Sequence, residues 1–160
     1  IPKPLQLLQI GADTTKLEQA AFSCHCFWTG EHKLGAIDGI IATEAGWLDG
    51  HEVTLVTYHK DLLALEKLIT KAREMKVANS VYLNSDSQRK QVSHLVKKPK
   101  SLKGYRKAKS SDQKRQISGT AFSKLNLTSS QACKVNAFCR GNPTEALKYL
   151  TSAQSAKITR

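Results

Sequence analysis

The chain contains 160 residues, with 25 Lys and Arg residues against 13 Asp and Glu residues, and its formal net charge is +12 at pH 7. This length suits one domain with its own core. No apolar run approaches the ~18 residues that cross a bilayer, so we expect no transmembrane segment. The positive charge favours anionic partners such as nucleic acid, acidic glycans or anionic membranes, and it leaves the fold undetermined.

The first predicted elements are a short arm and a series of strands with one helix. Residues 1–16 predict an extended arm, because Pro2 and Pro4 precede an apolar run that stops at Gly11. Three strands are expected at residues 17–22, 40–45 and 52–58, and a helix is expected at residues 27–34. The short turn at residues 47–50 joins the last two strands as a hairpin.

A second helix and a fourth strand complete the predicted core. Residues 61–75 carry apolar side chains at helical spacing, and residues 80–83 predict a strand. Ser85 or Asp86 caps a further helix that runs to residue 96. The order strand–helix–strand–strand–helix–strand is the ferredoxin-like split βαβ pattern. We therefore predict a mixed α/β (α+β) fold, in which helices flank one sheet and a short helical tail follows.

A basic segment lies between residues 97 and 115, where Asp112 is the only acid. Pro99 and Gly104 interrupt this segment. Residues 102–108 predict a final edge strand, and a helix is expected to start at Asp112. Such a segment is either a solvated surface or an anion-binding patch. The residues that we assign to an anion-binding patch are Lys97, Lys98, Lys100, Lys103, Arg106 and Lys107.

The C-terminal tail predicts two short helices. Thr128 is placed to cap the first, which carries two cysteines, and a proline opens the second. We expect three parts in the chain: an arm at residues 1–16, a core domain at residues 17–122 and a helical extension at residues 123–160. The four cysteines, Cys24, Cys26, Cys133 and Cys139, allow three disulfide pairings.

Residues 24–31, Cys-His-Cys-Phe-Trp-Thr-Gly-Glu, lie where the first strand gives way to the first helix. A cysteine at a helix N-terminus is close to unpaired backbone N–H groups and to the positive end of the helix dipole. Both favour the thiolate, which is the reactive form. Phe27 and Trp28 offer walls for an apolar pocket beside Cys26, and Glu31 lies one turn further along. This pattern favours a reactive thiol with a nearby acid, and a structural disulfide at Cys26 is the competing interpretation.

This stretch resembles the Gly-Cys-Phe-Trp-Gly-x-Glu motif of the A-type peptide methionine sulfoxide reductases, with matches at Cys26, Phe27, Trp28 and Glu31. The resemblance continues in order through residues 34–40, 43–47 and 50–58. These segments are similar to the family's Leu-Pro-Gly-Val, Thr-x-x-Gly-Tyr and Gly-His-Ala-Glu segments, the last of which leads into a strand that ends in Tyr. By this resemblance, Glu52 falls on the catalytic acid of the family, and residues 17–122 form a reductase-like domain with the same ferredoxin-like core.

The resemblance implies a thiol oxidoreductase that acts on peptide-methionine (S)-S-oxide. Cys26 would attack the sulfoxide sulfur, and a sulfenate and then a disulfide would follow. Glu52, with Glu31 as the second candidate, would protonate the oxygen. Phe27 and Trp28 would hold the S-methyl group.

The remaining partners also follow from the resemblance. Trp47 would replace a tyrosine at the rim of the pocket, and a core aromatic position fits it equally well. The resolving thiol would be Cys24, Cys133 or Cys139, and the reductant would be thioredoxin or a small thiol. The resemblance implies no metal or organic cofactor. Separately, a single Cys-x-Cys pair is poor spacing for zinc.

The chain departs from the family in two places. Two residues separate Trp47 from Gly50 where the family has a long insertion, and the family's later Asp-x-Gly-Thr-Gln-Tyr-Arg-Ser region is missing. The alternative function is therefore a secreted, basic, disulfide-stapled binding protein on a reductase-like scaffold without activity. The start at Ile1 and the N-glycosylation pattern at Asn126 lead us to expect secretion or another oxidising compartment, with the cytoplasm as the alternative.

Overall fold

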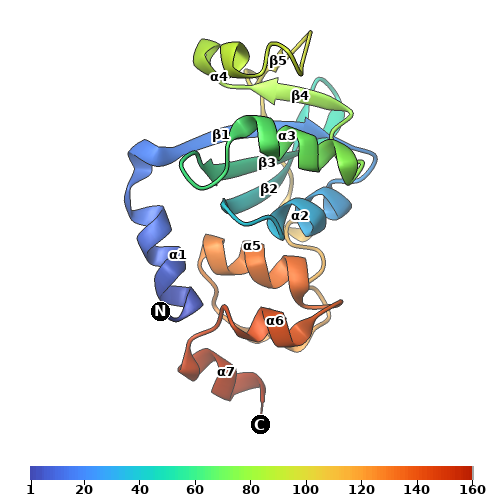
Figure 1. Cartoon of the computed structure of the whole chain (residues 1–160). Helices are drawn as coiled ribbons and strands as arrows, with labels where there is room; N and C mark the ends of the chain where they lie inside the picture. The colour runs from blue at the N-terminus through green and yellow to red at the C-terminus, as the bar shows by residue number, and fades with distance from the viewer. Residues whose placement is uncertain (160) are drawn as a thin grey trace.

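A curled sheet with helices packed against it forms the centre of the molecule (Figure 1). The computed structural model describes residues 1–159. Within these residues the six strands are β1 (Leu17–Ser23), β2 (Ile40–Leu48), β3 (His51–His59), β4 (Ser80–Leu83), β5 (Lys100–Ser101) and β6 (Arg106–Lys107). The α-helices are α1 (Lys3–Ala12), α2 (Phe27–Gly35), α3 (Leu65–Glu74), α4 (Asp86–Gln91), α5 (Ser129–Phe138), α6 (Pro143–Leu147) and α7 (Ser152–Ile158).

The strand order is β5-β4-β1-β3-β2-β6, and each neighbouring pair among the four central strands is antiparallel. With α2 after β1 and α3 after β3, these strands form the predicted split βαβ pattern, and the predicted fold class is confirmed. Ser23 at the end of β1 pairs with Val53, and Trp47 near the end of β2 pairs with Glu52. The register therefore brings the start of α2 beside the β2–β3 hairpin.

The two faces of the sheet pack against different partners. Alternate residues such as Phe22 and Val56 pack with Leu68 of α3 in the main core. The opposite face is covered by the connection between β5 and β6, whose Leu102 and Tyr105 pack in a smaller cluster. The helices α2 and α3 therefore cover one face, and a short coil segment covers the other.

The length of that coil explains the curl of the sheet. β5 and β6 are opposite edges of the sheet, although five residue steps separate Ser101 from Arg106. Such a segment reaches about 17 Å, whereas five strand spacings in a flat sheet cover about 24 Å. The edges must therefore bend toward each other. The Tyr105 ring lies directly on Gly46 of β2, where a side chain on residue 46 would collide with it.

The N-terminal arm differs from the prediction, because residues 3–12 are helical rather than extended. Pro4 lies in the first turn, where its fixed backbone angle suits a helix and its missing N–H has no cost. Leu7 is buried in a second core with residues of α5 and α6. Lys3 forms an ion pair with Glu145 at 3.1 Å and lies over the Tyr149 ring. The arm therefore packs against the C-terminal extension.

Other segments agree in part with the prediction. Both capped helices begin where predicted, at Ser85 and Thr128, and each has a capping box. The first ends at Gln91 and not at residue 96, because residues 92–95 form turns. The expected edge strand at residues 102–108 is restricted to β6, because the preceding residues cross the sheet face instead. The helix expected from Asp112 does not form, since residues 113–119 are in turns and Lys114 has a φ of 47°. Among the described residues no helix has the length and apolarity to cross a membrane.

Candidate active site

Cys26 occupies the N-cap position of α2. Its backbone is extended, with a φ of −146° and a ψ of 121°, and its side chain makes no capping hydrogen bond. Its carbonyl accepts the N–H of Gly30 at 3.0 Å, which closes the first helical turn. The half-buried thiol therefore does not serve as the helix cap, and it lies at the positive end of the helix dipole.

Glu52 binds this segment on both sides of Cys26. Its carboxylate Oε1 accepts the backbone N–H of Phe27 at 3.1 Å, and its backbone carbonyl accepts the N–H of Cys24 at 3.3 Å. The carboxylate thus caps the helix in place of the Cys26 side chain. The sequence-predicted nucleophile and acid are brought together at one helix end.

Two of the three predicted aromatic residues lie at this site. The rings of Phe27 and Trp47 meet edge to face, with centroids 5.4 Å apart and planes at 75°. Trp47 also pairs with Glu52 across the hairpin. Trp28 lies elsewhere on α2: it is 36% exposed, and the guanidinium of Arg115 lies 4.9 Å from the centre of its ring.

A cavity of about 430 Å³ opens at this end of the sheet. Cys24, Trp47 and Glu52 contribute to its lining, as do the exposed His25 and His51. The other lining residues are Ser23, Gly50, Asn79 and Ser80. The serines and Asn79 lie outside the sequence motif, and no pattern in the sequence pointed to them.

Cys24 lies beneath the first turn of α2. The chain bends at His25, and the Cys24 Sγ donates a hydrogen bond to the Cys26 carbonyl at 3.1 Å. Burial raises the pKa of the Cys24 thiol, and the backbone of Cys26 and the neighbouring Thr54 hydroxyl act against this rise. A Cβ on Gly30 would collide with Thr54 and lie 3.2 Å from the Cys24 Sγ, so this close packing requires glycine.

Glu31 has a different environment from Glu52. It is fully buried, and its Oε2 accepts the Thr43 hydroxyl at 2.8 Å. Its Oε1 accepts the backbone N–H of Lys114 at 2.9 Å, and its carboxylate also pairs with the Lys114 ammonium. Both oxygens are therefore engaged by groups that hold α2 against β2 and the segment after η2 (Ser110–Asp112).

The two tail cysteines are buried away from Cys26. Cys133 is fully buried at the C-terminal end of α2, where its Sγ lies 4.0 Å from the Gly35 carbonyl. Cys139 belongs to the second core, and its Sγ lies 3.3 Å from the Gln116 carbonyl. Within residues 1–159 all four cysteines are free thiols.

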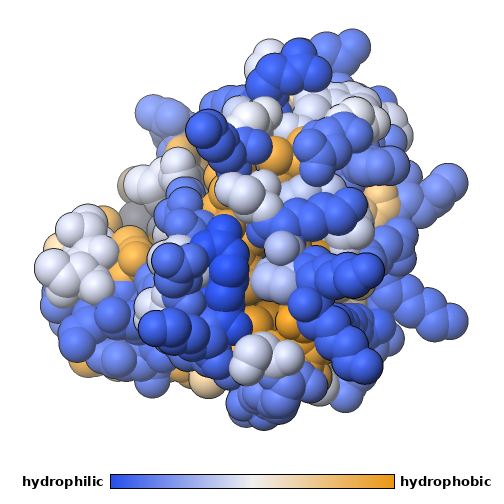
Figure 2. Space-filling view, turned by 90° about the horizontal axis from the view of Figure 1, so that it is seen from above, coloured by the Kyte–Doolittle hydropathy of each residue, from blue (hydrophilic) through white to orange (hydrophobic). Residues whose placement is uncertain are grey.

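The six predicted anion-binding residues are exposed and are divided between both edges of the sheet. Lys100 belongs to β5 and lies over the Tyr82 ring, whereas Arg106 and Lys107 belong to β6. Lys107 pairs with Glu44 at 3.6 Å. The view from the side of α4 and β5 shows mostly hydrophilic side chains with a narrow hydrophobic band between them (Figure 2). The set consists of Lys97, Lys98, Lys100, Lys103, Arg106 and Lys107.

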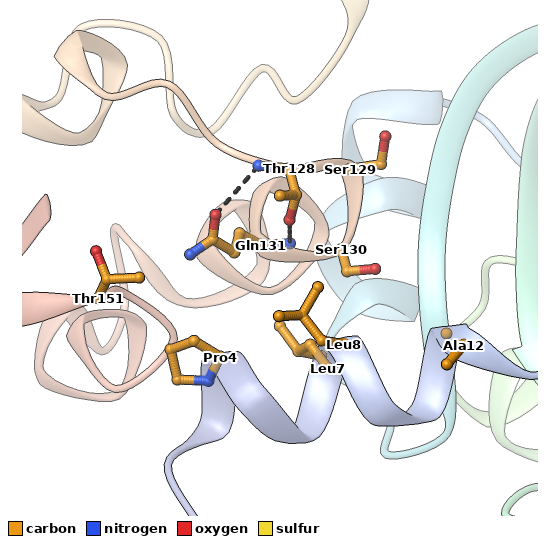
Figure 3. A pocket seen from close by; sticks show the side chains of 10 residues that line it. Pro4, Leu7, Leu8, Ala12, Thr128, Ser129, Ser130, Gln131 and Thr151 are labelled. Atoms are coloured by element: carbon orange, nitrogen blue, oxygen red, sulfur yellow. Dashed lines mark hydrogen bonds between the residues drawn. The ribbon is translucent and has the colours of Figure 1, made fainter.

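A larger cavity of about 520 Å³ lies between α1 and the N-terminal end of α5 (Figure 3). Leu7 and Leu8 form one wall, and Thr128 and Gln131, which cap α5 reciprocally, form the other. The residues that line it carry neither an ionisable side chain nor a thiol. We therefore assign the candidate active site to the smaller cavity beside Cys26. No cluster of three or more His, Cys, Asp or Glu residues suited to a metal ion occurs in the described part of the chain.

Comparisons with known proteins give a distant likeness only. No family model matches the chain, and no curated protein matches it. Among solved structures it is similar to Mxr1 from Saccharomyces cerevisiae in an unusual oxidized form, with 20% sequence identity and a TM-score of 0.45. The match covers 51% of this chain and 63% of that chain, which is the yeast methionine sulfoxide reductase A. The chain thus spans less than two thirds of Mxr1.

Proposed function

We propose that this protein is a thiol oxidoreductase of the methionine sulfoxide reductase A type, with Cys26 as the nucleophile and Glu52 as the acid. One observation carries the proposal: the Glu52 carboxylate is bonded to the backbone N–H of Phe27, the residue that follows the uncapped Cys26. The ordered motif resemblance of residues 26–58 adds the substrate class, a methyl sulfoxide such as peptide-methionine (S)-S-oxide.

The reaction moves oxygen from the substrate sulfur to Cys26. The thiolate attacks the sulfoxide sulfur while Glu52 gives a proton to the sulfoxide oxygen. The substrate is reduced to the thioether and Cys26 is oxidised to the sulfenic acid, so that atoms and electrons balance. A second thiol then condenses with the sulfenic acid and releases water.

The electrostatics of the helix end favour this division of roles. The N-terminus of α2 stabilises one negative charge, and the Glu52 carboxylate already occupies one of its N–H groups. Cys26 lies at the same helix end, so the proposed nucleophile and the proposed acid share one electropositive site.

The aromatic pair supports recognition of an apolar group. Phe27 is buried, and Trp47 stands against its ring at the edge of the cavity that Glu52 also lines. A methyl group next to a sulfoxide needs such an apolar wall beside a proton donor. Trp28, whose ring faces Arg115, is the weaker candidate for this contact.

The test is turnover of the two sulfoxide epimers of N-acetylmethionine with dithiothreitol as reductant. The wild-type protein should reduce the S epimer, Cys26→Ser should be inactive, and Glu52→Gln should lose about 100-fold or more. Glu52→Gln should keep the wild-type circular dichroism spectrum, which separates catalysis from folding. Equal turnover by Glu52→Gln would reject its role as the acid. Failure of the wild-type protein to reduce either epimer would reject the enzyme and favour the non-catalytic binding protein.

A further inference from the structure

We infer that Cys24 is the thiol that resolves Cys26, so that oxidation closes a disulfide within the Cys24-His25-Cys26 segment. The inference rests on the reactivity proposed above for Cys26, and it assigns a role that the resemblance left open among three cysteines. The contact between the Cys24 Sγ and the Cys26 carbonyl, at 3.1 Å, is its starting point.

The local backbone permits this pairing because the segment is not a strand. Residues two apart on a regular strand have Cα atoms about 6.6 Å apart and near the ~6.8 Å upper limit for a disulfide. β1, however, ends at Ser23, and the chain bends at His25 before α2 begins. The bend turns the Cys24 sulfur back toward the backbone of Cys26.

The two tail cysteines are excluded by their positions. Cys133 lies at the far end of α2, about 12 Å along the helix axis from its start, and is fully buried against Gly35. Cys139 lies in the second core beside the Gln116 carbonyl. Either sulfur would reach Cys26 only if α5 left its place against α2.

The environment of Cys24 suits a thiol that reacts second. Only 8% of it is exposed, and burial raises its pKa, so it does not compete with Cys26 for an external substrate. The neighbouring Thr54 is fully buried, and its hydroxyl has no hydrogen-bond partner in the described structure. This hydroxyl is free to donate to the Cys24 sulfur as its proton leaves.

The chemical step conserves atoms and electrons. The Cys24 sulfur attacks the sulfur of the Cys26 sulfenic acid, the S–S bond forms and the S–O bond breaks. The hydroxide leaves as water with the proton from the Cys24 thiol. Cys24 is oxidised by one electron and the Cys26 sulfur is reduced by one, and a dithiol reductant later restores both thiols.

The test uses one equivalent of hydrogen peroxide, so that it does not depend on sulfoxide turnover. Trypsin places Cys24 and Cys26 together in the peptide at residues 17–33, with Cys133 and Cys139 in two separate peptides. The oxidised wild-type protein should yield the peptide at residues 17–33 lighter by two hydrogen atoms and unlinked to any other. A peptide linked through Cys133 or Cys139 would overturn the inference.

Matched variants separate the possible failures. Cys24→Ser and Cys24→Ala should stop at the sulfenic acid and be trapped by dimedone, whereas Cys133→Ser and Cys139→Ser should oxidise like the wild type. Dimedone trapping in the wild type equal to that in Cys24→Ala would reject the resolving role. If the protein reduces sulfoxides while Cys24 stays a thiol, this inference is rejected and the proposed function stands. If the Cys24–Cys26 disulfide forms but sulfoxides are not reduced, the inference is supported and only the proposed function is rejected.

Discussion

The two ends of α2 carry similar groups in different surroundings. At the N-terminal end, Cys26 lies beside the Glu52 carboxylate, which accepts the N–H of Phe27 at 3.1 Å. At the C-terminal end, Cys133 lies beside Lys134, whose ammonium donates to the Gly35 and Ile37 carbonyls at 2.9 Å each. The Glu52 carboxylate is negative and lies at the positive end of the helix dipole, and the Lys134 ammonium is positive and lies at its negative end. Each charge therefore stabilises the helix end beside it.

Burial separates the two ends. Cys26 is half-buried, and its neighbours Cys24, His25 and Glu52 line an open cavity. Cys133 and Lys134, in contrast, are enclosed between α2 and α5. Burial raises the pKa of the Cys133 thiol, although the nearby charges of Lys134 and Lys114 oppose the rise. A thiol next to a charged helix cap is thus a candidate for chemistry only where solvent and substrate reach it.

The strongest test of this comparison is the rate at which each thiol is alkylated. Iodoacetamide should label Cys26 about a thousandfold faster than Cys133, because Cys133 reacts only through a local opening that costs about 4 kcal/mol. Peptide mapping after limited labelling of the reduced protein measures both rates. Preferential labelling of Cys133 or Cys139 would show that exposure does not decide reactivity here.

A second test compares the two carboxylates of the site region. Glu31→Gln should lower the free energy of unfolding by about 3 kcal/mol, because it leaves the Lys114 ammonium without its buried partner. Glu52→Gln should leave unfolding nearly unchanged and act on turnover instead. Urea denaturation of both variants checks this. If Glu31→Gln is stable but inactive while Glu52→Gln is active, Glu31 takes the role of the acid.

The C-terminal end of α2 is tested through Lys134. Lys134→Met should cost about 1–2 kcal/mol at pH 7, because the Gly35 and Ile37 carbonyls lose their donor. Burial lowers the pKa of Lys134 below its usual 10.5. Between the lowered value and 10.5 the unfolded chain holds more protons than the folded one, so wild-type stability rises with pH in that window.

The cost of Lys134→Met should therefore grow as the pH rises toward 10.5, since the variant has no such group. Denaturation of both proteins across the alkaline range isolates this difference from the other groups that titrate there. A cost that shrinks with pH would mean that the buried amine is stabilised, not destabilised, as an ammonium.

Local patterns made the sheet and the motif predictable. The alternation of strands with the helices α2 and α3 follows from patterns in contiguous sequence. The position of Cys26 before Phe27 at a helix start can be recognised in the same way. The contact between Glu52 and α2 could also be predicted, because it depends on the β2–β3 hairpin, which the order of the motif segments implies.

Long-range packing accounts for what the sequence left unseen. Glu31 and Lys134 are charged and resemble surface residues, yet each is buried through a partner 83 or more positions away. Pro2 and Pro4 led us to expect extended chain, but residues 3–12 are helical because Leu7 packs on the distant α5 and α6. No local pattern indicates the distant partner against which each of these groups packs.

A further effect concerns the basic segment, which lies outside both ends of α2. We expect its exposed residues to bind heparin or DNA through charge alone, so affinity should fall steeply with salt and ignore sequence. Replacing Lys97, Lys98, Lys100 and Lys103 by Gln should reduce the logarithmic salt slope by up to about 3.6, which is 0.9 for each lost contact. Binding that survives high salt or prefers one sequence would contradict this.

The same variant, with four lysines replaced by Gln, tests whether the net charge of +12 or the start of α2 makes Cys26 reactive. Exposed charges are screened beyond about 8 Å at physiological ionic strength, whereas the backbone N–H groups of α2 lie directly beside the thiol. The ratio of Cys26 to Cys133 labelling should therefore change by less than about twofold. Alkylation at low and at physiological salt measures it. A Cys26 rate that falls together with heparin affinity would mean that the surface field, and not the geometry at the start of α2, activates the thiol.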